Sequence, residues 1–152
     1  MRNKPAASAA SFLIACVALF GSATPLRADP VVLRWNGASG ASWDSSTANW
    51  LDAGNNAVAW QPGAEAQFTG TGGLVNIAGD VSATNLTFTG NGYVLLGAGR
   101  LSLEGSISSA AATTNCLAAD LLTVSGLAKT GAGALALTRC TGPLAVQQGS
   151  LL

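Results

Sequence analysis

Four charged residues are the candidates for chemistry in this 152-residue chain: Asp80, Glu104, Asp120 and Arg100. Polysaccharide lyases and hydrolases gather carboxylates, and in lyases a basic side chain, on one face of a sheet. The separations of these residues would allow some of them to meet on a sheet. However, Asp80 follows a glycine and Glu104 precedes one, which is typical of solvated turn residues. We therefore expect corner positions, and we rank an enzyme last among the functions considered.

Other catalytic and cofactor motifs are missing from the sequence. The chain has no histidine, which removes the Ser-His-Asp and Cys-His systems and imidazole metal sites. It has no G-x-x-x-x-G-K-[ST] phosphate loop, and Gly72-Gly73 is not followed by the spacing of a calcium-binding nonapeptide. We expect no cofactor, no metal and no enzymatic activity.

All four tryptophans lie in one segment, residues 29–73, among Gly, Ser and Asn turn residues. One interpretation is an aromatic cap, because large rings can cover the apolar interior and strand edges at the first turn of a stacked β structure. The alternative is a carbohydrate-binding platform in which exposed rings stack on sugars. The residues concerned are Trp35, Trp43, Trp50 and Trp60.

From residue 74 onward, apolar residues alternate with small polar ones in short stretches separated by glycine-rich turns. Period two bounded by glycine predicts short β-strands. Neighbouring strands can form hairpins, because Asn91-Gly92 suits a two-residue turn. They can also form successive sides of a parallel solenoid.

The last segment, residues 126–152, reads GLAKTGAGALALTRCTGPLAVQQGSLL. It resembles the autotransporter-associated β-strand repeat, L-x-K-x-G-x-G-x-L-x-L followed by a loop and G-x-L. The tryptophan-rich segment is similar to the one that often precedes such repeats. The resemblance implies an all-β fold, a short right-handed parallel β-helix, in which residues 74–152 make roughly three to four turns. It also implies that Lys129, which matches the repeat lysine, faces solvent.

Comparison of the chain with itself suggests a 24-residue period, which aligns Cys116 with Cys140. On neighbouring turns their Cα atoms would lie about 5 Å apart, within disulfide range. We predict a Cys116–Cys140 bridge if the exported chain meets an oxidising compartment. Passengers of the resembled family tend to avoid such bridges, so free thiols are the alternative.

The N-terminus has the pattern of an export signal. Arg2 and Lys4 precede an apolar run at residues 11–21 that is too short to span a membrane, so residues 1–28 are predicted to form a helical, cleaved signal peptide. A lipobox ending at Cys16 is the alternative. Cleavage after Ala28 leaves four basic and seven acidic residues, a net charge of −3, which favours neither nucleic acid nor an anionic membrane as a partner.

Together these features predict an exported, non-catalytic passenger segment that forms a stalk or adhesin at the cell surface or outside the cell. Its expected partners are further repeats of the same protein, of which this chain would be a fragment, or glycans. The alternative function is a small secreted carbohydrate-binding module.

Overall fold

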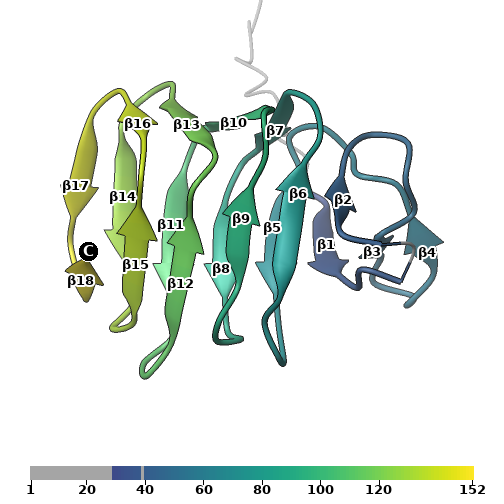
Figure 1. The fold of residues 1–152 in the computed structure, drawn as a ribbon, viewed down its shortest axis with the longest axis horizontal. Coiled ribbons are helices and arrows are strands. Elements are labelled where there is room, and N and C mark those ends of the chain that lie inside the picture. The colour runs from purple at the N-terminus through teal and green to yellow at the C-terminus, as the bar shows by residue number, and fades with distance from the viewer. Residues whose placement is uncertain (1–28, 39) are drawn as a thin grey trace, which may run out of the picture.

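The computed structural model describes residues 29–38 and 40–152, so the predicted signal peptide and Cys16 lie outside the described residues. The described residues are all-β: they form short strands and no helix. Most strands stack in parallel into a β-solenoid of about four turns, as the sequence predicts (Figure 1).

Each complete turn contributes one strand to each of three sheets. The turns are β5 (Glu65–Phe68), β6 (Leu74–Ile77) and β7 (Val81–Ala83); β8 (Leu86–Phe88), β9 (Val94–Leu96) and β10 (Arg100–Leu103); β11 (Ser106–Ser109), β12 (Thr114–Leu117) and β13 (Asp120–Thr123); and β14 (Leu127–Thr130), β15 (Ala134–Leu137) and β16 (Cys140–Thr141). A further partial turn holds β17 (Leu144–Val146) and β18 (Ser150–Leu151).

Four strands precede these turns: β1 (Val32–Trp35), β2 (Ser42–Trp43), β3 (Trp50–Leu51) and β4 (Ala57–Val58). The first sheet has the order β17-β14-β11-β8-β5-β1-β3-β4, the second β18-β15-β12-β9-β6-β2 and the third β16-β13-β10-β7. Pairing is parallel except at the N-terminal end, where β3 pairs antiparallel with both β1 and β4. The first complete turn begins at Glu65, inside the segment 29–73 that the sequence assigned to the tryptophan-rich part.

The observed period corrects two expectations. Leu86 pairs with Ile107, 21 positions later, and Leu101 pairs with Leu121, 20 positions later, so the predicted 24-residue period is wrong. The hairpin alternative at Asn91-Gly92 is also wrong, because β8 and β9 on either side of it belong to different sheets. Gly92 turns a corner of the solenoid with a positive φ of 83°.

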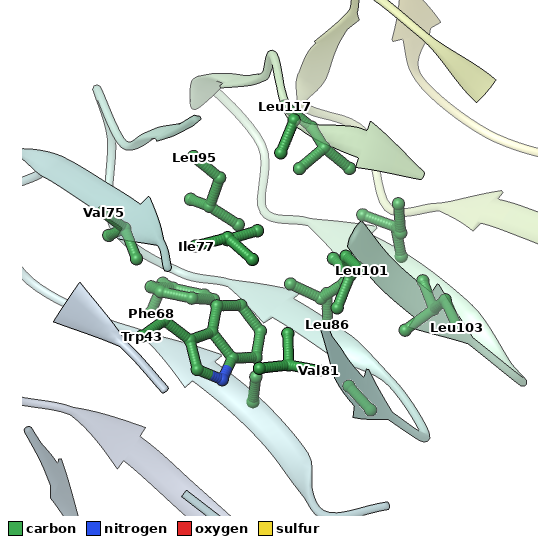
Figure 2. Packing of buried hydrophobic residues seen from close by; sticks show 14 of the residues in the cluster. Trp43, Phe68, Val75, Ile77, Val81, Leu86, Leu95, Leu101, Leu103 and Leu117 are labelled. Carbon is green, nitrogen blue, oxygen red and sulfur yellow. The ribbon is translucent and has the colours of Figure 1, made fainter. Parts of the chain in front are cut away.

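The interior is filled from three sides. Phe68, Ile77 and Leu101 come from the first, second and third sheet, and all three are buried side chains of one apolar core (Figure 2). Along the strands, burial alternates residue by residue, for example in β11 and β13. This alternation is the period-two pattern that the sequence displays.

Within residues 29–38 and 40–152, no helix is long and apolar enough to cross a membrane.

Candidate functional site

The tryptophan cluster, Trp35, Trp43, Trp50 and Trp60, lies at the N-terminal end of the solenoid. Trp43 and Trp50 are 0% exposed and Trp60 is 3% exposed, whereas Trp35 is only partly buried. This burial corrects the expectation of an exposed carbohydrate platform for three of the four rings. Of the four rings, only Trp35 is more than slightly exposed.

The four indoles pack mainly edge to face. Ring centroids lie 5.1 Å apart for Trp35 and Trp50, 5.0 Å for Trp43 and Trp50, and 4.9 Å for Trp43 and Trp60, all in T-shaped contacts. The Nε1 groups of Trp43 and Trp50 are buried without a hydrogen-bond acceptor. Edge-to-face packing places positive ring edges on negative ring faces, which reduces the cost of burying such donors.

Asp44 shapes the chain directly after Trp43. Its carboxylate accepts hydrogen bonds from the Ser42 hydroxyl, from the backbone N–H and hydroxyl of Ser46, and from those of Thr47. These bonds, the one from Ser42 first, hold the pKa of Asp44 well below its usual range. The charged carboxylate therefore fixes the turn that leads from β2 toward β3.

Asn49 connects the same strands from inside. It is fully buried, and its Nδ2 donates to the Ser42 carbonyl at 2.8 Å. Its own carbonyl accepts the backbone N–H groups of Asn36 at 2.9 Å and Gly37 at 3.2 Å. The Asn49-Trp50 pair thus joins β1, β2 and β3, which positions the tryptophan cluster.

Lys129 is the clearest departure from the sequence analysis. The expected solvent-facing side chain is fully buried. Lys129 stands in register with the buried Ile107 of the preceding turn, so it occupies an inward-facing position. The solvent-facing role implied by the family resemblance is wrong for this residue.

The Lys129 ammonium lies in a cage of backbone carbonyl oxygens, here called the carbonyl cage. It donates to the carbonyls of Thr130 at 2.7 Å, Gly131 at 2.9 Å, Gly133 at 3.0 Å and Gln148 at 3.3 Å. Thr130 is the last residue of β14, Gly131 and Gly133 belong to the corner that follows it, and Gln148 belongs to the next turn. Burial lowers the pKa of Lys129, while charge-assisted bonds to the carbonyls oppose that shift by favouring the ammonium.

Two glycines make room for the carbonyl cage. Gly131 has a φ of +73°, and a Cβ there would lie 2.2 Å from the Ser109 carbonyl oxygen of the preceding turn. Gly149 has a φ of +77°, and a Cβ there would lie 2.4 Å from the Gly133 carbonyl oxygen and 3.0 Å from Lys129 Nζ. Gly131 and Gly149, which lie in consecutive turns, are therefore both part of the carbonyl cage.

The third sheet carries a column of alternating charge, Asp80, Arg100, Asp120 and Arg139, here called the charge column. Arg100 is in register with Asp120, and the neighbouring pairs place Asp80 beside Arg100 and Asp120 beside Arg139. Arg139 Nε lies 3.0 Å from Asp120 Oδ1, and the Arg100 backbone N–H donates to Asp80 Oδ1 at 2.9 Å.

The charge column contains three of the four residues singled out for catalysis. Glu104 follows the opposite end of β10 and does not join it. Asp120 and Arg139 border a groove of about 510 Å³, but their side chains are 44% and 72% exposed. Exposed pairs of opposite charge in register stabilise the stacking of turns modestly and do not create a water-excluded site.

The two cysteines are free in the structure, so the expected bridge is not formed. Cys116 lies in the second sheet in register with Val94 and Ala136, whereas Cys140 lies in the third sheet in register with Leu121. The 24-residue alignment paired them, but the true period places them on different sides of the solenoid. Cys140 is exposed, and partial desolvation by its neighbours raises the pKa of its thiol.

In the part of the chain that the structure describes, no group of three or more Cys, Asp or Glu side chains is arranged to hold a metal ion. Comparisons of the chain with family models, curated proteins and solved structures gave no match.

Removal of the Lys129 ammonium should destabilise the fold. We expect Lys129→Met to lower the free energy of unfolding by about 2–4 kcal/mol, because the cage carbonyls lose their donor at roughly 1 kcal/mol each. Urea unfolding followed by circular dichroism measures this loss. The matched control is Ile107→Met, an apolar exchange at the equivalent position one turn earlier, which should cost less than about 1.5 kcal/mol. A Lys129→Met protein as stable as the parent would refute the structural role of the cage.

Reversal of one charge in the column should also destabilise the protein, but in a salt-dependent manner. Arg100→Asp places three carboxylates in succession, and we expect a loss of about 1–2 kcal/mol at low ionic strength. The loss should shrink in about 1 M salt, where the Debye length is about 3 Å. Glu104→Lys, a charge reversal of equal size outside the column, is the control and should change stability by less than about 0.5 kcal/mol. An equal loss at both salt concentrations would contradict an electrostatic origin.

Proposed function

We propose that this chain is a non-catalytic structural segment of an exported bacterial surface protein. In this role the solenoid forms a stiff stalk, closed at its N-terminal end and able to accept further turns at its C-terminal end. The observation that carries the proposal is the difference between the two ends of the stack.

The N-terminal end is covered, which supports its role as a cap. The edge of β7 is occupied by residues 60–64: Gly63 N–H and Trp60 Nε1 both donate to the Ser82 carbonyl, at 3.0 and 3.1 Å, and Thr84 N–H donates to the Ala64 carbonyl at 3.0 Å. The β3–β4 hairpin extends the first sheet with antiparallel strands. Residues 60–64 therefore block pairing at the β7 edge, and the other two sheets end in β4 and β2, strands of two residues that offer little edge for another chain to pair with.

The C-terminal end is different. Strands β16 and β18 are exposed along their length, and most of β17 is exposed. Val146, which occupies the position in register with Lys129, is 47% exposed, and Leu151, in register with the buried Leu135, is 38% exposed. Interior positions that open toward solvent, together with unpaired strand edges, fit the stacking of a further turn.

The mechanism of such a segment is geometric. Each turn pairs with the turn before and after it, so stability adds up from neighbour to neighbour and the rod can lengthen without a new fold. The turns in the described structure differ in their corners, which are the surfaces that a stalk presents. The role of residues 1–28 as an export signal follows from their sequence pattern.

A solenoid that accepts further turns should gain stability from an added one. We propose to append a second copy of residues 117–152 after Leu152. The register Leu135–Leu151 places the appended Leu117 opposite Leu137, its own partner in the native stack. Each apolar side chain that becomes fully buried contributes about 1.5–3 kcal/mol to the free energy of unfolding, from which the entropy cost of ordering the added residues is subtracted. Each kcal/mol that remains raises Tm by about 2–8 °C.

Thermal unfolding of the parent and the extended chain tests this expectation. The control is an extension of equal length that carries serine at the appended copies of Leu121, Leu127 and Leu135, which removes the apolar interior and should not raise Tm. An unchanged or lower Tm for the leucine-containing extension would refute the proposal that this end accepts a further turn.

Export can be tested with the full chain in a Gram-negative host. We expect the mature protein outside the cytoplasm, cleaved either after Ala28 or after Ala23, where Gly21-Ser22-Ala23 is a second site of small residues. Cell fractionation and intact mass determine this. The control is Leu13→Arg combined with Ile14→Arg, which interrupts the apolar run and should retain the full-length precursor. An acylated N-terminus at Cys16 would favour the lipoprotein alternative, and an uncleaved cytoplasmic parent would refute export.

A further inference from the structure

The corner between the first and second sheets, near the N-terminal end, contains a groove of about 360 Å³. Its lining comes from β1 and the residues after it, from the segment after β5 and the start of β6, and from Tyr93 in the second turn of the solenoid. The principal lining residues are Trp35, Asn36, Thr69, Thr71, Leu74 and Tyr93, and glycine backbone completes the wall.

Trp35 is the tryptophan that borders this groove. Its ring is held from behind by an edge contact with Trp50 at 5.1 Å and a tilted contact with Phe68 at 6.2 Å. It is partly buried, so one part of the indole is fixed by the core and the rest remains accessible. A ligand would therefore meet an aromatic surface that does not have to be ordered on binding.

The wall beside Trp35 is also preorganised. The Tyr93 hydroxyl donates to the Thr69 carbonyl at 2.6 Å, which fixes the phenol ring against the corner. Gly72 N–H donates to the Asn91 carbonyl at 2.9 Å, and Thr71 forms a parallel bridge with Asn91. These backbone groups are already used between turns, so they are not offered to an added peptide strand.

The chemistry of the lining selects a class of ligand. The groove has no Asp, Glu, Lys or Arg among its lining residues, so it offers no countercharge to an ionic ligand. Asn36 and Thr71 are exposed and supply amide and hydroxyl groups, while Leu74, 62% exposed, adds apolar surface near the indole. A neutral molecule with one apolar face and several hydroxyl groups satisfies both kinds of surface.

We propose that this groove is a binding site for a neutral saccharide. The sugar ring stacks on Trp35, and its hydroxyl groups exchange hydrogen bonds with Asn36 and Thr71. The site does not depend on the stalk proposal, because it is contained in the N-terminal end and needs neither export nor a further turn.

The test uses the full chain labelled with ¹⁵N and titrated with cellotriose, maltotriose, chitotriose and mannotriose. The four indole N–H signals are assigned by single Trp→Phe variants. We expect at least one sugar to shift the Trp35 indole signal saturably, with the three buried indoles changing little. Trp35→Ala should weaken binding by about 10-fold or more, and Asn36→Ala or Thr71→Ala by about 2–10-fold.

If Trp35→Ala affects folding, the Asn36→Ala and Thr71→Ala variants still test the proposal, because both residues are exposed and their replacement leaves the core intact. Ser102→Ala, in a separate groove of about 240 Å³ beside Trp60, is the matched control and should not alter binding. The absence of any saturable shift up to about 10 mM sugar would overturn the proposal. So would equal binding by the Asn36→Ala and Thr71→Ala variants, or a shift caused only by a neutral Gly-Ser peptide.

Discussion

The corners of the solenoid impose the constraint on which the rest of the structure depends. Along the strands, backbone groups pair with neighbouring turns, but at each corner the chain changes direction and leaves carbonyl oxygens near the interior. Different turns satisfy them with different donors. Tyr93 Oη donates to the Thr69 carbonyl at 2.6 Å, Asn115 Nδ2 donates to Gly90 at 3.2 Å, and Lys129 binds four carbonyls at 2.7–3.3 Å. Each donor is buried, so its loss would leave acceptors without water to replace it.

Lys129 shows why one polar residue can be retained at an apolar position. Burial of an ammonium is costly, and only complete hydrogen bonding offsets that cost. Three of its acceptors lie in its own corner and the fourth, Gln148, lies in the next turn, so the cage couples neighbouring turns. The exposed pair of Asp120 and Arg139 makes the same kind of connection in water, where an ion pair contributes about 0–1 kcal/mol. The buried cage is therefore the stronger coupling.

Period-two alternation predicted the strands because it reports directly on burial, whereas the parallel stacking and the approximate number of turns were implied by the resemblance of residues 126–152 to a known β-strand repeat. The alternation also indicated the orientation of Lys129, since it places residue 129 on the same face as the buried Leu127, but the family resemblance implied a solvent-facing lysine. The 24-residue period came from small repeated residue types that match by chance. The spacing from Asp80 to Arg100 and from Arg100 to Asp120, 20 positions in both steps, matches the length of the turns in the third sheet there, whereas other turns differ in length, so no single period aligns the whole chain. The sequence left two interpretations of the tryptophans open, an aromatic cap and an exposed platform, because the burial of each ring depends on three-dimensional closure of the first turn.

The charge column and the unequal corners address a hazard of any repetitive fold. Turns rich in leucine and alanine resemble one another, so a strand displaced by a whole turn would still bury apolar residues. Alternation of Asp80, Arg100, Asp120 and Arg139 penalises such a displacement, because a shift by one turn brings like charges together. The Asn115 and Lys129 corners add to this penalty, since each donor fits only its own set of carbonyls. Polar contacts thus specify which turn stacks on which, both the charge column, which contributes little to total stability, and the carbonyl cage, which contributes more.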